Sequence, residues 1–374
     1  MQRRICDVRS YPDHLPAVAA YGLPAVVGRW PDRPVPPGEW PSFLAAVERH
    51  RVTGQLERAV ADGAFPVTAQ QREDMLRSRR TFVLRGMLVD AELVRITAAL
   101  RAAEVPVRVL KGSAVARLDY ADPRLRTYND VDLLVRPADF PAAVRILQRD
   151  GMTRILAEPR PGFDARFDKG TTLRTAAGLE VDLHRTFVLG PWGFRVDLDE
   201  LWACAETFTI GGTGLDALSP RHRFLHACYH AALGDWPLRL GSLRDVAEQL
   251  PDVESDRGWM RATARRWGVE SVVAAAVADT VRLLGLPGDT PLRRWAAAHR
   301  PGRRDLRWLA LHTREDKTFA AQALATVGVL SGVRARVSYV RALALPDAEY
   351  VADRHATAGS RLRYGLTQAW RGRA

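Results

Sequence analysis

The sequence predicts an α+β protein, in which a small mixed sheet is flanked by helical regions before and after it in the chain. Apolar residues recur at helical spacing in stretches between about 41 and 103, and again beyond about 219. Between them lie short β-branched runs bounded by Pro and Gly. We therefore expect an irregular lead-in and helical arm over 1–70, an α/β core over 71–217, and a helical region over 218–374.

The expected elements follow in order along the chain. Residues 1–40 are rich in Pro and Gly without a sustained period, so we expect them to be irregular. A helix begins near Pro41, and a longer one is predicted over 71–103. The core is then predicted to consist of a strand at 107–110, a helix at 113–118, a strand at 131–135, a helix to about 150, and strands at 152–156, 171–175 and 179–183.

The composition excludes several classes of protein. The net charge is +12, but Lys and Arg are spread along the chain with no block interleaved with aromatics, so nucleic-acid binding is not favoured. The three cysteines are scattered without a CxxC pair, which indicates a reducing cytoplasm rather than a disulfide framework. We find no signal peptide and no apolar stretch of the roughly 20 residues that a membrane span needs.

Two acids start the predicted strand at 131–135. Asp130 and Asp132 are separated by one residue, so both carboxylates project to the same face of that strand. Two neighbouring carboxylates repel unless a cation lies between them, and oxygen ligands of this kind suit Mg²⁺ or Mn²⁺. Asp182 alternates with apolar neighbours in a later strand; if the two strands are adjacent, the three carboxyl groups should lie about 4 to 7 Å apart around the metal.

A glycine–serine turn precedes these acids. Gly112 and Ser113 separate a strand from a helix, where glycine permits close approach of a phosphate and helix amides attract it. Lys111, beside this turn, is one of only three lysines in a chain that otherwise uses Arg. Each feature alone is common in structural turns and solvated strand ends, but their order favours phosphoryl transfer.

The motifs LKGSA, RTYNDVDLLV and VDLHR resemble the DNA polymerase β-like nucleotidyltransferase superfamily, and within it the bacterial branch of uncharacterised nucleotidyltransferase family proteins. The resemblance covers roughly residues 40–355, although only these three motifs are specific. It implies a polymerase β-like core and Mg²⁺-dependent transfer of a nucleoside monophosphate from an NTP, with ATP expected, to a hydroxyl group. The acceptor stays open between a small molecule, a peptide and a protein.

The resemblance also implies which residues bind the metal and which contact the nucleotide. It implies metal binding by Asp130, Asp132 and Asp182, with Asp182 alternatively the general base. The predicted nucleotide contacts are Lys111, Gly112, Ser113, Arg126 and His184, of which Arg126 occupies the place of an arginine found before the acid pair in that branch. A non-catalytic, regulatory or antitoxin-like nucleotide-binding relative of the same fold is the alternative.

Two further features stay open. His222, His226 and His230 share one helical face, which suits either packing beneath a helix or the floor of an active site, and less well a metal. His184 shares a strand face with Asp182, where it either orients a carboxylate or makes an ordinary structural hydrogen bond. Lys169 falls in an expected loop or hairpin ahead of the third acid and is the weakest candidate for a contact.

Overall fold

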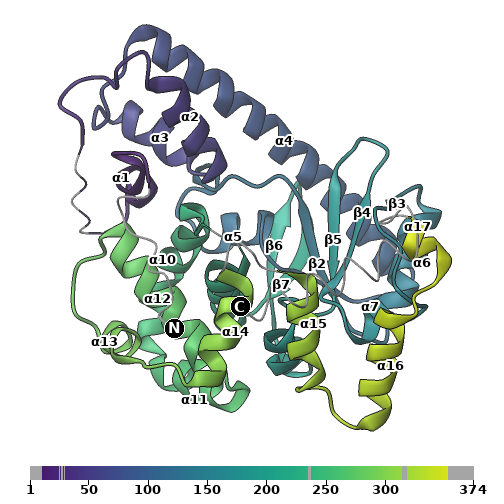
Figure 1. Cartoon of the computed structure of the whole chain (residues 1–374). Helices are drawn as coiled ribbons and strands as arrows, with labels where there is room; N and C mark the ends of the chain where they lie inside the picture. The colour runs from purple at the N-terminus through teal and green to yellow at the C-terminus, as the bar shows by residue number, and fades with distance from the viewer. Residues whose placement is uncertain are drawn as a thin grey trace.

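The computed structural model describes residues 11–352 with the exception of positions 25, 27, 29, 235–236 and 314–317. Its N-terminal arm ends in a helix of 34 residues that crosses the top of the molecule in Figure 1. Thr68 and Gln71 form a capping box, which fixes the start of this helix by satisfying two of its free N–H groups. The arm consists of α1 (Leu15–Ala20), α2 (Trp40–Arg49), α3 (Thr53–Ala61) and α4 (Ala69–Ala102).

In the described part of the chain, seven strands form one mixed sheet in the order β3-β4-β5-β2-β1-β7-β6. The central strand β2 pairs antiparallel with β1 and parallel with β5. Parallel strands need a crossover, and the chain supplies it with α6, β3, α7 and β4 between β2 and β5. The strands are β1 (Val107–Val109), β2 (Val131–Val135), β3 (Thr153–Arg154), β4 (Gly170–Arg174), β5 (Glu180–His184), β6 (Ala205–Ile210) and β7 (Thr213–Leu218).

The two faces of the sheet have different partners. Val131, Leu133 and Val135 alternate along β2 and belong to a hydrophobic cluster shared with α4 and α6. Asp132 and Leu134 therefore point to the opposite face, where Leu134 joins a second cluster with the C-terminal helices. Asp132, the acidic residue of β2, consequently lies between the sheet and these helices. The short helices within and beside the sheet are α5 (Ser113–Leu118), η2 (Pro123–Leu125), α6 (Phe140–Arg149), α7 (Phe163–Arg166), η3 (Pro191–Arg195) and α8 (Glu200–Ala203).

The C-terminal helices pack against the N-terminal arm as well as the sheet. Leu15 and Val18 of α1 share a hydrophobic cluster with Leu243 of α10 and Val273 of α12. The arm and the C-terminal helices therefore share one hydrophobic cluster, and Figure 1 shows α1 beside α10 and α12. These elements are α9 (Pro220–Tyr229), a π-helical turn η4 (His230–Gly234), α10 (Leu240–Ser255), α11 (Arg257–Trp267), α12 (Glu270–Leu284), α13 (Pro291–Ala298), α14 (Arg303–Thr313), α15 (Phe319–Val327), α16 (Val333–Ala344) and α17 (Ala348–Ala352).

The α+β class with a mixed sheet flanked by helices is confirmed, and so are the strands predicted in the core from β1 to β5. Two expectations need correction. The lead-in over 1–40 is not wholly irregular, because α1 lies within it. The strands β6 and β7 were not predicted, although β7 pairs directly with β1. None of the helices in the described ranges combines the length and apolar character required to cross a membrane.

Candidate active site

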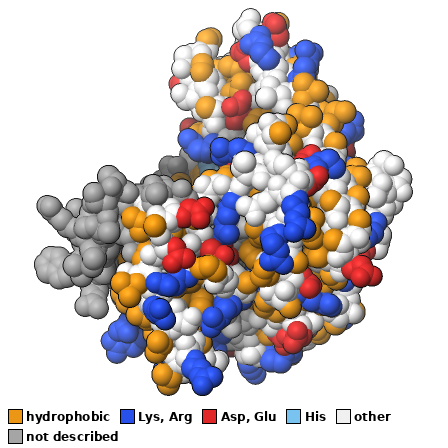
Figure 2. Space-filling view, turned by 90° about the vertical axis from the view of Figure 1, so that its right-hand side faces the viewer, with side chains coloured by type: hydrophobic (Ala, Val, Ile, Leu, Met, Phe, Trp, Pro, Cys, Tyr) orange, Lys and Arg blue, Asp and Glu red, His pale blue; other side chains and the backbone are white. Residues whose placement is uncertain are grey.

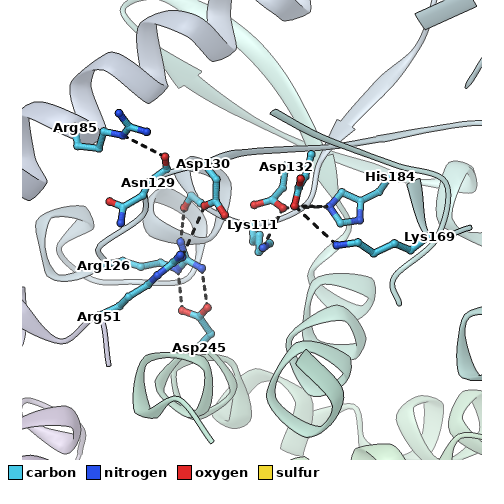
Figure 3. A network of polar contacts seen from close by, with 12 residues as sticks. Arg51, Arg85, Lys111, Arg126, Asn129, Asp130, Asp132, Lys169, His184 and Asp245 are labelled. Carbon is cyan, nitrogen blue, oxygen red and sulfur yellow. Dashed lines mark hydrogen bonds and ion pairs between the residues drawn. The ribbon is translucent and has the colours of Figure 1, made fainter. Parts of the chain in front are cut away.

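The register between β2 and β5 places two of the predicted acids side by side. Asp132 pairs with Asp182 across these parallel strands, and His184 lies two residues further along β5 on the same face. One ligand atom of each residue lies within 4.8 Å of those of the other two. We call these three residues the carboxylate side of the site; Figure 3 shows Asp132 and His184 facing each other there.

Asp132 is the buried centre of this group. Its side chain is fully buried, and its Oδ1 lies 2.9 Å from Lys111 Nζ and 3.1 Å from His184 Nε2. Burial opposes ionisation, but Lys111 and His184 outweigh it and lower the pKa of Asp132 well below its ordinary value. Its Oδ2 is buried without a hydrogen-bond partner among the described residues. Asp132 is therefore an anion with one oxygen still able to bind a further group.

Lys111 reaches Asp132 because β1 and β2 are neighbours. The N–H of Leu110, at the end of β1, donates to the Asp132 carbonyl, so the next residue starts opposite this acid. Burial disfavours the ammonium ion, yet Asp132 and Asp130 raise the pKa of Lys111 above its ordinary value. Lys111 is thus the internal counter-ion of Asp132 and Asp130 (Figure 3).

Asp182 is the more accessible of the two paired acids, with 22% of its side chain exposed. Thr172, its partner on β4, donates its hydroxyl to Asp182 Oδ1 at 2.6 Å. Lys169 Nζ lies 3.9 Å from Asp182 Oδ2. Lys169 was the weakest candidate from the sequence, because a residue just before a strand gives no indication of which acid it will face.

Asp130 precedes β2 and has a different environment. Its Oδ1 lies 3.7 Å from Arg51, which comes from the turn between α2 and α3. Asp130 does not belong to the group formed by Asp132, Asp182 and His184. The sequence placed the three acids in one cluster; the structure brings Asp132 and Asp182 together and turns Asp130 towards Arg51 on the arm (Figure 3).

Gly112 and Ser113 form what we call the glycine–serine side. Gly112 has φ +56°, a conformation that favours glycine, and it starts the six-residue helix α5. The Ser113 side chain is buried, and its hydroxyl donates to the Asp90 carboxylate of α4. Arg117 and the Tyr128 hydroxyl donate to the same carboxylate. The hydroxyl of Ser113 therefore stabilises the contact between α5 and α4.

Arg126 is buried beneath the loop that leads to β2. Its guanidinium forms a two-pronged ion pair with Asp245 of α10, at 2.7 and 2.8 Å, and donates to the Gly112 carbonyl at 3.0 Å. The Tyr120 hydroxyl donates to the same Asp245 carboxylate at 2.8 Å. Arg126 thus ties the glycine–serine turn to a C-terminal helix 119 residues away in the chain. No sequence signal identified Asp245 as its partner.

The three histidines at helical spacing separate into two environments. His222 lies 3.6 Å from Glu200 and stacks on Trp267. Burial lowers the pKa of His226 to about 3, and the positive charge of Lys111 contributes to this shift. The pKa of His230, in the π-helical turn, is lowered by burial and Lys111 as well. His226 and His230 therefore pack uncharged near Lys111, and within the described residues the three histidines form no metal-binding group.

Comparison with known proteins identifies the family. A family model described as "Uncharacterised nucleotidyltransferase" matches residues 36–285. The chain belongs to this nucleotidyltransferase family. None of the curated proteins matches it. Among solved structures, an antigenic nucleotidyltransferase-like protein from Paracoccidioides brasiliensis is similar, with 17% identity and a TM-score of 0.29 over 51% of this chain and 92% of that chain.

Membership of a nucleotidyltransferase family implies a divalent cation, and the residues present fit one. Two carboxylates and an imidazole form a donor set that accepts Mg²⁺ or Mn²⁺. The buried Asp132 Oδ2 has no partner among the described residues, and an unpaired buried oxygen is costly unless a cation or water satisfies it. The ammonium of Lys111 shows that the site already accommodates positive charge at Asp132.

Proposed function

We propose that this protein is a Mg²⁺-dependent nucleotidyltransferase that moves a nucleoside monophosphate from an NTP, with ATP expected, to a hydroxyl group of an acceptor. The observation that supports this most directly is the pairing of Asp132 with Asp182 on adjacent parallel strands, with His184 beside them. Asp132 and Asp182 are the carboxylates that would hold the cation, and Asp130 would join them only by turning away from Arg51. When bound there, the cation would neutralise charge on the triphosphate and polarise the phosphorus under attack.

The residues of the chain have separate tasks in this proposal. Asp182, which is partly exposed and oriented by Thr172, takes the proton of the acceptor hydroxyl. The hydroxyl oxygen then forms a bond to the α-phosphorus, and the bond from that phosphorus to the pyrophosphate oxygen breaks. His184 holds Asp132 in place through its Nε2.

The positive charges around the acids would hold the triphosphate. Lys111 and Lys169 lie beside Asp132 and Asp182 respectively, so both ammonium groups are within reach of phosphates bound at these carboxylates. Gly112 leaves room for a phosphate at the turn, because it has no side chain. Ser113 and Arg126 act indirectly, since their polar groups hold the turn to α4 and α10.

The metal site can be tested without an acceptor by measuring the affinity of the protein for Mn²⁺. Bound Mn²⁺ is detected as a loss of the free-ion signal in electron paramagnetic resonance. Replacing Asp132 by Asn removes the central charge and should weaken binding by several kcal/mol, on the order of 10³-fold. The matched control is Asp216→Asn, which changes an acid of β7 that is paired with Arg108 away from the site. Equal Mn²⁺ affinity for both variants would exclude Asp132 as a ligand.

Catalysis is tested by incubating the protein with Mg²⁺, α-labelled NTPs and hydroxyl-bearing acceptors, and measuring both the labelled product and the pyrophosphate released. We expect release by the wild type and by Asp216→Asn, and a loss of at least 10³-fold in Asp132→Asn and Asp182→Asn. Retained binding of ATP and Mn²⁺ without pyrophosphate release, across amine, alcohol, peptide and protein acceptors, would instead support the non-catalytic nucleotide-binding relative.

A further inference from the structure

A cavity of about 420 Å³ continues the active face of the sheet beyond Asp182. Thr172 and Glu180 line it, and both lie on the same face as Asp182, because Thr172 is its cross-strand partner and Glu180 lies two residues before it. Helix α15 contributes Phe319, and α17 contributes Tyr350. The volume is that of a typical small-molecule site, which spans roughly 300 to 1,000 Å³.

The cavity and the glycine–serine turn lie on opposite sides of β2. Lys111 and Gly112 follow β1, which lies on one side of β2, whereas the cavity lies over β4 and β5 on the other side. The hydroxyl of Thr172 links the cavity directly to Asp182, at 2.6 Å. A molecule in the cavity would therefore approach Asp182 from the side opposite the glycine–serine turn.

The lining of the cavity is acidic, although the protein as a whole is basic. The chain carries 55 Lys and Arg residues against 43 Asp and Glu, and basic side chains are scattered over the face shown in Figure 2. The cavity is nevertheless lined by Asp164, Asp168 and Glu180, without a Lys or Arg among its described lining residues. Ion pairs with Arg154 and Arg174 partly neutralise Asp164 and Glu180 from outside the cavity.

Asp168 is the lining carboxylate that forms no ion pair with another described side chain. It accepts the backbone N–H groups of Lys169, at 2.6 Å, and of Gly170, and burial raises its pKa, an effect that a bound ammonium ion would oppose. Apolar side chains complete the lining: Leu156 is 41% exposed and Phe319 is 40% exposed. Large apolar residues left in contact with solvent inside a cavity indicate a ligand with an apolar part.

We infer that this cavity binds the acceptor and that the acceptor is a small hydroxyl-bearing amine with an apolar portion. Its protonated amine would form a charge-assisted hydrogen bond with Asp168. Its apolar part would lie against Phe319 and Leu156, and its hydroxyl would reach Asp182. The identification of this ligand as the acceptor rests on the proposed transfer reaction, whereas its binding does not.

The binding test uses the full chain without ATP or metal, so that it is independent of catalysis. Calorimetry compares phenylalaninol and glucosamine with their N-acetylated forms, which keep the hydroxyls and lose the charge. We expect at least one amine to bind tenfold or more tightly than its acetylated partner. Asp168→Asn should abolish that preference, and Phe319→Ala should weaken phenylalaninol in particular, while Asp216→Asn behaves as the wild type.

The outcomes distinguish this inference from the proposed function. If no amine in this panel is preferred over its acetylated form, or if Asp168→Asn keeps the preference, the inference about the cavity is wrong. Mn²⁺ affinity, measured in the same Asp168→Asn preparation, should equal that of the wild type and shows that the variant is folded. If amines bind as expected but labelled nucleotide is never transferred to them, the site is correct and the proposed transfer reaction is not.

Discussion

On the carboxylate side of the site, Asp132 keeps a buried oxygen without a partner in the described structure, and Asp182 is partly open to solvent. On the glycine–serine side, the Ser113 hydroxyl donates to Asp90 and the Gly112 carbonyl accepts from Arg126. Both sides carry the polar residues that the sequence pattern singles out. They differ in the bonds that these residues form within the protein: Asp132 has a buried oxygen without a partner in the described structure, whereas the polar groups of the glycine–serine side hold helices together.

This difference indicates that a motif residue can stabilise the fold without touching a ligand. A group that has already formed its strongest bonds inside the protein must break them before it can bind a phosphate, and breaking a buried ion pair is costly. On the carboxylate side, Asp132 Oδ2 can bind a further group without such a rearrangement. Substitutions on the two sides should therefore affect different measurements: ligand affinity on the carboxylate side, and stability on the glycine–serine side.

The largest effect on stability is expected from Arg126→Met. Arg126 and Asp245 have side chains that are only 8% and 10% exposed, and removing one partner leaves a buried charge without its counter-ion. We expect the free energy of unfolding, measured by urea denaturation, to fall by about 3–5 kcal/mol. The double variant Arg126→Met/Asp245→Leu should recover most of this loss, because it removes both charges.

An effect of Arg126→Met on ligand binding instead of stability would contradict the distinction between the two sides. If Arg126→Met unfolds at the same urea concentration as the wild type but binds ATP tenfold more weakly, the guanidinium contacts phosphate directly. The comparison would then have to place Arg126 with the ligand-binding residues.

A smaller effect, and on a different quantity, is expected from Lys111→Met. The ammonium of Lys111 and a divalent cation compete for Asp132 Oδ1, from which Lys111 Nζ lies 2.9 Å away. Removing the ammonium should tighten Mn²⁺ binding about tenfold, or ~1.4 kcal/mol. Lys169→Met is the matched control: its Nζ lies 3.9 Å from Asp182, so its removal should change Mn²⁺ affinity less. Weaker Mn²⁺ binding by Lys111→Met would show that Lys111 supports the cation rather than competing with it.

The sequence was sufficient for the carboxylate side because this side follows local rules. Alternation along β2 and β5 places Asp132, Asp182 and His184 on one face of the sheet, and adjacency of the two strands was the one assumption needed. Alternation could not show that Asp130, at the end of a loop, would face Arg51 of the helical arm. That contact depends on how the arm folds back over the sheet.

The glycine–serine side could not be predicted in the same way, because its partners are distant in sequence. Asp90 lies on α4 and Asp245 on α10, and neither belongs to the three specific motifs LKGSA, RTYNDVDLLV and VDLHR. The missed hairpin is a different case. Gly211 and Gly212 both have positive φ and join β6 to β7, and a Gly-Gly pair between two short runs is a recognised hairpin pattern. β6 has only one buried side chain, Phe208, so its apolar alternation was weak.

The smallest effect is expected from Ser113→Ala, and it tests the comparison at the residue where motif and structure differ most. The hydroxyl of Ser113 is one of several donors to Asp90, together with Arg117 and Tyr128, so its loss leaves that carboxylate satisfied. We expect the free energy of unfolding to fall by about 1 kcal/mol. ATP affinity, measured by calorimetry with Mg²⁺, should change less than about threefold, which corresponds to under ~0.7 kcal/mol.

Asp90→Asn should also lower stability and leave ATP affinity unchanged, because it weakens the same contact between α4 and α5. A tenfold loss of ATP affinity in Ser113→Ala at unchanged stability would mean that the hydroxyl leaves Asp90 to bind phosphate, and the glycine–serine side would then be a ligand site that the unliganded protein keeps closed.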